Sequence, residues 1–182
     1  TMIYVTHDQI EAMSLADKIA IIDHGKLMQY GAPLDIYNSP QNRFVAHFVG
    51  SPRMNLVDGE LLDEGGSLNL ILSDGAKVPL TGQVKQDFTA SSSIKNGSLG
   101  IRPQDIYFGE KRNSADIHLD GTVQVLERVG PKRLAYLSVQ ETVFLAFDEQ
   151  EQLKENDKVS FFLSSKASLA FDLETGRRLG GA

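Results

Sequence analysis

His7 is the residue with the clearest chemical potential in this sequence, because of what lies on either side of it. A short run of β-type residues, 2–5, stops at the polar corner Thr6-His7-Asp8. A helix pattern follows at once, since Asp8 is a good N-cap residue and Glu11 stands three residues later, as in a capping box. A strand, a histidine and a helix in this order place an imidazole at the carboxyl end of a strand, where open α/β sheets collect their ligands.

A histidine at such a corner also has a purely structural interpretation, as a helix cap or as a hydrogen-bonded structural side chain. The tripeptide alone favours that interpretation, because single short motifs occur in many unrelated sequences. The wider sequence around His7 reverses the preference.

Several separated motifs, all in one order, carry a family resemblance that spans almost the whole chain. They are residues 5–13, 15–19, 23–26 and 29–33 around and after His7, and residues 50–55, 100–105 and 171–176 further on. These stretches resemble the C-terminal portion of the ATP-binding subunit of ABC importers, in the maltose, sugar and glycerol-3-phosphate branch, with its transport-associated OB (TOBE) domain. The resemblance matches His7 to the switch-loop histidine of that family and makes Asp8 and Gln9 its structural neighbours.

The resemblance implies a catalytic role for His7 in the full-length parent protein. Phosphoryl transfer to water depends on positioned charge and hydrogen bonds around the γ-phosphate. An imidazole N–H at a strand end can donate to a γ-phosphate oxygen, while the other ring nitrogen meets the backbone of an opposing subunit. ATP and Mg²⁺ are therefore expected as cofactors of the parent only, and no cofactor or metal site is expected in this chain.

The other parts of an ATPase site are missing from the sequence. A phosphate-binding loop has the form G-x-x-x-x-G-K-[ST], but here Gly25-Lys26 is followed by Leu27. The Ser-Gly-Gly signature is absent as well, and Asp23 is followed by His24 where a Walker B strand would continue with glutamate. Because the chain opens inside a β-type pattern, we expect a C-terminal fragment of a longer protein, one that does not hydrolyse ATP alone.

Composition excludes several classes of function. The chain has 182 residues and a net charge of −6, whereas a nucleic-acid groove brings a basic excess. With no cysteine it has neither a disulfide framework nor a thiolate metal site, which fits a reducing cytosol. No apolar run approaches the ~20 residues of a membrane helix. The expected location is cytoplasmic, peripheral on the inner face of the cell membrane through permease subunits.

Gly50-Ser51-Pro52 is the best domain boundary, dividing the chain into residues 1–50 and 51–182. The first part reads as a remnant of the ABC ATPase domain. After the helix at Asp8 it holds a buried strand at 19–22 paired with 27–30, a helix at 34–37, and a helix capped by Asn42. That last helix carries an apolar stripe, which favours core contact over a partner surface. The stripe consists of Phe44, Val45, Phe48 and Val49.

The sequence pattern of the second part is typical of a small β-barrel. Short β-type runs alternate with turn signals, and residues 81–96 are polar enough to predict a loop. The runs are 55–63, 67–73, 76–80, 98–101, 106–108, 121–129, 133–139, 142–147, 159–163 and 168–172. The predicted fold is mainly β: an OB-type, TOBE-like barrel preceded by a short α/β remnant of a nucleotide-binding domain.

Isolated charged residues in the β-rich part carry weaker predictions. Arg102 either binds an anion or a regulator, or pairs with Asp105 to fix a turn, and the pairing is favoured. His47 and His118 stand alone, with no ligand spacing for a metal. A cluster of acidic residues is most simply a solvated face. It comprises Asp148, Glu149 and Glu151.

These features predict a regulatory fragment of the ATP-hydrolysing subunit of an importer for a sugar or glycerol-phosphate-like solute. The expected partners are a second ATPase subunit in a homodimer, membrane permease subunits, and a regulatory protein or small effector, with no nucleic acid. Two alternatives stay open at this stage. One is a stand-alone barrel that binds a small ligand or oxyanion, and the other is a pure dimerisation module.

Overall fold

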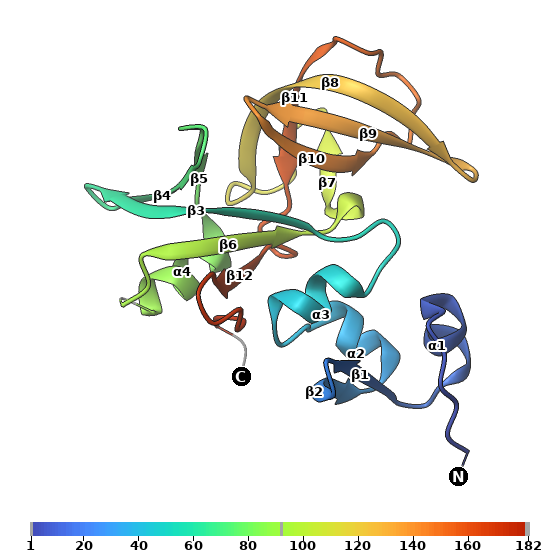
Figure 1. Ribbon diagram of the computed structural model, residues 1–182. Coiled ribbons are helices and arrows are strands. Elements are labelled where there is room, and N and C mark those ends of the chain that lie inside the picture. Colours follow the sequence, from blue (N-terminus) through green and yellow to red (C-terminus); the bar gives the residue numbers. More distant parts are fainter. Residues whose placement is uncertain (1, 92, 181–182) are drawn as a thin grey trace.

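The computed structural model describes residues 2–91 and 93–180 and has a helical part beside a larger β-rich part (Figure 1). The helical part begins with α1 (Gln9–Leu15) and the antiparallel hairpin of β1 (Ile19–Asp23) and β2 (Lys26–Gly31). Two short helices complete it, α2 (Pro33–Asn38) and α3 (Arg43–Phe48). None of the helices in the described residues is long and apolar enough to cross a membrane.

The β-rich part consists of two five-stranded antiparallel sheets. The first has the strand order β12-β6-β3-β4-β5. Its strands are β3 (Asn55–Glu64), β4 (Ser67–Leu72), β5 (Lys77–Pro79), β6 (Asn96–Ile101) and β12 (Leu169–Asp172). The second has the order β10-β9-β8-β11-β7. Its strands are β7 (Ile106–Phe108), β8 (Ile117–Val129), β9 (Lys132–Val139), β10 (Thr142–Phe147) and β11 (Lys158–Leu163).

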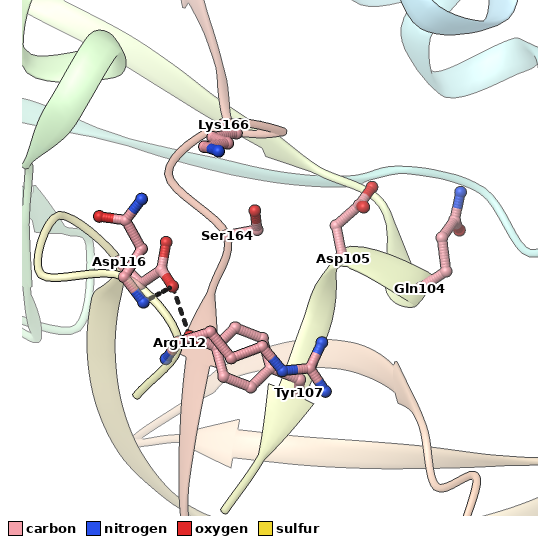
Figure 2. A pocket seen from close by; sticks show the side chains of 8 residues that line it. Gln104, Asp105, Tyr107, Arg112, Asp116, Ser164 and Lys166 are labelled. Carbon is pink, nitrogen blue, oxygen red and sulfur yellow. Dashed lines mark hydrogen bonds between the residues drawn. The ribbon is translucent and has the colours of Figure 1, made fainter. Parts of the chain in front are cut away.

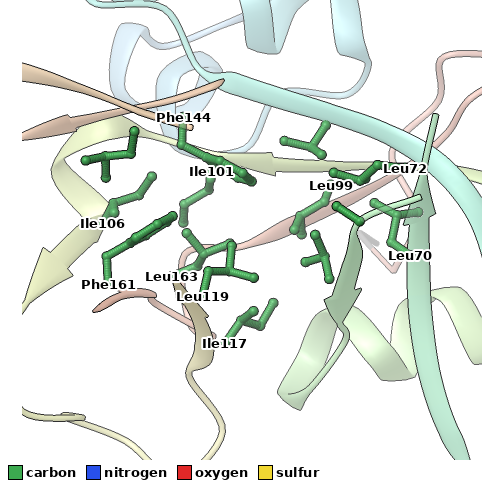
Figure 3. Close-up of a cluster of buried hydrophobic side chains, with 14 of the residues drawn as sticks. Leu70, Leu72, Leu99, Ile101, Ile106, Ile117, Leu119, Phe144, Phe161 and Leu163 are labelled. Carbon is green, nitrogen blue, oxygen red and sulfur yellow. The ribbon is translucent and has the colours of Figure 1, made fainter. Parts of the chain in front are cut away.

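Apolar side chains from both sheets meet in one continuous core (Figure 3). Phe144 of β10 and Phe161 of β11 are fully buried, with ring centroids 5.7 Å apart. Leu99 and Ile101 enter the same core from β6 of the other sheet. Because the two faces are buried against each other, the period-2 alternation of each strand fixes its register.

Two polar side chains tie the sheets together at their ends. Asn55 of β3 donates to the carbonyls of Ile101 (3.1 Å) and Leu145 (3.0 Å) and accepts from the Leu145 N–H (2.7 Å). Asp74 lies in the turn after β4 and accepts from the backbone N–H groups of Glu141 and Thr142 before β10. Backbone groups at the ends of the strands gain side-chain partners in this way.

The predicted β runs and the mainly β fold class are confirmed, since each run corresponds to one of the strands β3–β12. Asn42 is confirmed as the cap of α3, because its Oδ1 accepts from the Val45 N–H at 2.9 Å. In the apolar stripe, Val45 and Val49 are buried core residues and Phe44 packs against them, as expected, whereas the core contact predicted for Phe48 is wrong because it is 39% exposed. The division of the chain at residue 50 stays a prediction.

The prediction of a loop over residues 81–96 is wrong, because α4 (Gly82–Ala90) lies there. Val84 and Phe88 are one turn apart and fully enter the main core, where Phe88 packs against Gly97 of β6. The helix is polar everywhere else, so two apolar residues at spacing i, i+4 gave too weak a periodic signal.

Two further predictions are corrected. Residues 19–22 do form a strand paired with β2, as predicted, but that strand is not buried, since of its side chains only Ile21 is buried and Ile22 is 64% exposed. The acidic cluster is not uniformly solvated. Asp148 is buried and receives hydrogen bonds from the Arg133 guanidinium, because a carboxylate removed from water needs such a partner. Glu151 pairs with Arg128 at 2.8 Å on the surface, and Glu149 is exposed.

The burial of Phe88 leads to a prediction about stability. We expect Phe88→Ala to lower the free energy of unfolding by about 3–5 kcal/mol, because the truncated side chain leaves a cavity in the shared core. Gln86→Ala, at an exposed position of the same helix, is the matched control and should change stability by less than about 0.5 kcal/mol. Urea unfolding followed by circular dichroism measures both, and equal effects would contradict the placement of α4.

Candidate functional site around His7

His7 lies in the turn that leads into α1, and its side chain is exposed to solvent. Asp8 caps the helix as predicted, because its Oδ1 accepts from the N–H groups of Ile10 (2.7 Å) and Glu11 (3.2 Å). None of the hydrogen bonds or ion pairs among the described residues involves the His7 imidazole. The position of the His7 corner is therefore set by the backbone on either side of it and not by contacts of the ring.

The corner is cross-linked by short-range hydrogen bonds, although not as a complete capping box. The Thr6 hydroxyl donates to Glu11 Oε2 at 3.0 Å and accepts from the Asp8 N–H at 2.9 Å. Glu11 thus binds the Thr6 side chain where a capping box would use the backbone N–H of the cap residue. These bonds span His7 and restrict its backbone.

The predicted strand at residues 2–5 is not formed. These residues have no strand structure, and Met2, Ile3 and Val5 are each close to 90% exposed. A strand needs a neighbour to satisfy its backbone groups, and within the described residues the sheets offer them none. His7 therefore follows a segment without regular secondary structure instead of a strand in a sheet.

Gln9, the first residue of α1, fastens the His7 corner to the end of α3. Its Nε2 donates to the Phe48 carbonyl at 2.6 Å, and its Oε1 accepts from the Gly50 N–H at 2.9 Å. Both groups lie at a helix C-terminus, where carbonyls have no partner within the helix. One amide side chain thereby satisfies the peptide groups on either side of Val49.

Arg102 reaches the same segment from the β-rich part, directly after β6. Its Nη1 donates to the Val49 carbonyl at 2.8 Å and its Nη2 to the Tyr37 carbonyl at 2.6 Å. Its guanidinium carbon stands 3.6 Å from the centroid of the Tyr37 ring. The side chain is only 4% exposed, so this cation is held by two helix ends and an aromatic face.

The predicted pairing of Arg102 with Asp105 is wrong. No ion pair between the two forms among the described residues; instead the guanidinium points to the backbone of α2 and α3. Burial lowers the pKa of Arg102, and the nearby Tyr37 and Asp105 offset part of that effect. Burial raises the pKa of Asp105, opposed by the charge of Arg102. The Arg102 contacts were missed because they join residues 53 and 65 positions apart.

Gly50 is required where these contacts converge. Its φ of +125° is one that L residues rarely adopt, and a Cβ there would lie 2.7 Å from Arg102 Nη1. Residues 48–50 therefore form a three-residue hinge peptide, held from one side by Gln9 and from the other by Arg102. We use the name hinge peptide for residues 48–50 below.

The other histidines show no metal site. His47 Nε2 lies 3.1 Å from Arg53 Nη1, and His118 stacks on Phe162 with Asp120 nearby. In the described parts of the chain, no group of three or more His, Asp or Glu side chains is arranged to hold a metal ion.

A second polar cluster lies in a cavity of about 230 Å³ beside β7 (Figure 2). Its anchor is the buried Asp116, which accepts from the Tyr107 hydroxyl, the Asn113 N–H, and both the N–H and the hydroxyl of Ser165. Burial raises the pKa of Asp116, but these hydrogen bonds outweigh it, so that the pKa lies below its ordinary value of 3.8.

The cavity is lined by opposite charges. Arg112 stacks on the Tyr107 ring at 4.1 Å, and Lys166 lies across from Asp105 and Asp116. Burial and the bond to Asp116 raise the pKa of the Tyr107 hydroxyl. Asp116 uses its hydrogen-bonding capacity within the protein, so its role is structural. No sequence pattern pointed to it.

The fold and the hinge peptide define a mainly β chain of the OB type that carries a histidine-bearing helical segment. The family description "MalK OB fold domain" matches residues 50–106. The xylose/arabinose import ATP-binding protein XacK of Haloferax volcanii is 38% identical over 98% of this chain and 46% of its own length. The maltose/maltodextrin import ATP-binding protein MalK of Vibrio vulnificus is 40% identical over 77% of this chain and 36% of its own.

A third relative, the alpha-glucoside transport ATP-binding protein AglK of Rhizobium meliloti, is 41% identical over 75% of this chain. The resemblance predicted from the motifs is confirmed: the chain is of the same family as the C-terminal part of the ATP-binding subunits of ABC importers. It spans about half the length of the first of these relatives and about a third of the other two. The role of His7 stays a prediction.

Asp116 provides a pH-dependent test of the cavity. Because its pKa is lower in the folded chain than the ordinary 3.8, its stabilising effect is present above about pH 4 and is lost as the pH falls through the folded value. We expect Asp116→Asn to lower the free energy of unfolding at neutral pH by about 1–3 kcal/mol. The difference from wild type should shrink toward roughly pH 2.

Asp120→Asn is the control, because Asp120 is exposed and its side-chain contacts, to the Ser160 hydroxyl and to His118, lie on the surface. Denaturant unfolding at several pH values measures the free energies. A difference between wild type and Asp116→Asn that is independent of pH would refute the assigned charge state.

Proposed function

We propose that the chain is the C-terminal regulatory portion of an ATP-hydrolysing importer subunit that powers uptake of a sugar or a glycerol-phosphate-like solute. The single observation that carries the proposal is the match along 98% of the chain to a protein named as a xylose/arabinose import ATP-binding protein. Relatives named for maltose and alpha-glucoside transport support the same solute class. The activity belongs to the assembled subunit.

The distribution of exposed apolar side chains supports the proposal that residues 1–50 pack against further protein. Large exposed apolar residues concentrate there. They are Met2, Ile3, Tyr4, Val5, Ile10, Leu15, Ile22, Leu27, Tyr30, Leu34 and Phe48, against four in the β-rich part. Eleven large exposed apolar side chains within fifty residues favour an interaction site there. It is consistent with a segment cut from a larger α/β domain.

In this proposal His7 supplies one hydrogen-bond donor to the γ-phosphate of ATP. The residues of this chain do not form a binding site for ATP or Mg²⁺. The sequence has no phosphate-binding loop, and among the described residues no three His, Asp or Glu side chains are arranged to hold a metal ion. Those groups are therefore assigned to other parts of the subunit. The exposure of the imidazole is consistent with a donor that meets its acceptor in an assembled site.

The proposed partners are a second copy of the subunit and membrane permease subunits. The protein is accordingly proposed to lie in the cytoplasm, on the inner face of the membrane. The β-rich part is proposed to support pairing of the two copies and to receive a regulatory protein or small effector. The net charge of −6 argues against nucleic acid as a partner.

A stand-alone oxyanion-binding barrel is the alternative. Arg112 and Lys166 at the 230 Å³ cavity favour it, whereas Asp105 and Asp116 in the same lining oppose an anion. Thermal stabilisation of the chain by molybdate or sulfate would favour this alternative over the importer subunit.

The role of His7 is tested in the subunit that includes the ATP-binding residues. We expect His7→Ala to lower ATP turnover by about 100-fold or more, because a positioned donor to the transition state is lost, while nucleotide binding stays measurable. His24→Asn is the control, since His24 is an exposed turn residue with φ of +45°, a conformation that asparagine tolerates. Near-normal hydrolysis by His7→Ala would remove His7 from the mechanism.

A further inference from the structure

We infer that Gln9 and Arg102 are positioning residues for His7: together they fix α1 and the His7 corner relative to the β-rich part by gripping the hinge peptide from both sides. The inference rests on the proposed function for what His7 does. The grip itself stands on contacts within this chain. Neither residue touches the phosphate in this proposal, so each acts by positioning His7.

The first half of the grip is the buried cation. Arg102 follows β6, whose registers with β3 and β12 hold it in the first sheet. Its two donors end on the carbonyls of Val49 and Tyr37, the last turns of α3 and α2. A buried guanidinium without a carboxylate partner needs both carbonyls. The ends of both helices are thereby pinned to the sheet.

The second half is the amide of Gln9. It uses its donor on the Phe48 carbonyl and its acceptor on the Gly50 N–H, and the peptide group that supplies this N–H also supplies the Val49 carbonyl bonded by Arg102. Three consecutive residues are thus bonded alternately to α1 and to the β-rich part. Since Gln9 is two residues from His7, any displacement of the hinge peptide moves the base of the His7 corner.

Another contact offers a matched control, because it joins the same helix to the same sheet without touching the hinge peptide. Arg43, at the first turn of α3, bonds both carboxylate oxygens of Asp58 on β3, at 2.8 and 2.7 Å. Asp58→Asn weakens this docking at the opposite end of α3. If any lost contact between α3 and the sheet loosened the helical part, Asp58→Asn would act like the variants at residues 9 and 102. If the inferred grip is correct, only the variants at residues 9 and 102 loosen α1.

Amide hydrogen exchange in the 182-residue chain tests the grip directly. Gly50 N–H donates to Gln9 and Ala12 N–H donates to the Asp8 carbonyl, so these two amides report the hinge peptide and α1. We expect Gln9→Met and Arg102→Met each to speed exchange at both amides by about ten-fold or more. Asp58→Asn should leave both rates within about two-fold of wild type.

A purely structural role for Arg102 would instead speed exchange throughout, including at the Leu137 N–H in the core strand β9. Unchanged rates at Ala12 in both variants, or equal acceleration at Ala12 and Leu137, would overturn the inference. Should Arg102→Met fail to fold, Gln9→Met at its half-buried position decides the question alone.

The assembled subunit separates this inference from the proposed function. Arg102→Met is expected to lower kcat by about ten-fold with KM for ATP unchanged, since the donor is misplaced and nucleotide binding is not. If α1 loosens while His7→Ala hydrolyses ATP normally, the proposed function fails and the grip stands. If His7→Ala is inactive while Gln9→Met and Arg102→Met keep both exchange rates and kcat, the grip fails and the proposed function stands.

Discussion

The buried guanidinium of Arg102 is the interaction on which the arrangement of this chain depends. It is a cation removed from water with two carbonyl partners and an aromatic face. Such a group is costly to bury unless its donors are satisfied. The carbonyl ends of α2 and α3 must therefore stay where Arg102 meets them, and Gly50 leaves room for that contact because a Cβ there would lie 2.7 Å from Arg102 Nη1.

The two parts of the chain are stabilised in different ways. The β-rich part buries a continuous apolar core between two five-stranded sheets and closes its ends with Asn55 and Asp74. The helical part has a small cluster around Ile36 and Val45, and much of its apolar surface is exposed. It meets the first sheet through a second small apolar cluster, in which Ala46 of α3 packs with Met54 and Phe171, and through directional contacts such as the Arg43–Asp58 ion pair and those of the hinge peptide.

Local sequence patterns predicted most of the fold, because strands, turns and caps depend on residues that are close together in the sequence. Asp8 and Asn42 were recognisable as caps, and the β runs from residue 55 onward as strands. The predictions that failed concern contacts between residues far apart in the sequence. The helix at 82–90 depends on Val84 and Phe88 finding the core, and Arg102 finds carbonyls more than 50 positions away. Residues 2–5 have strand-forming side chains without a neighbouring strand among the described residues.

The central claim, that one defined geometry relates the His7 helix to the β-rich part, is tested most directly by a distance between them. Because the chain has no cysteine, Ser14→Cys on α1 and Glu110→Cys beyond β7, both exposed, place two spin labels without competing sites. Double electron–electron resonance should give a single narrow distance distribution. A broad distribution, or several populations of comparable size, would show that the hinge peptide does not hold α1 in one place.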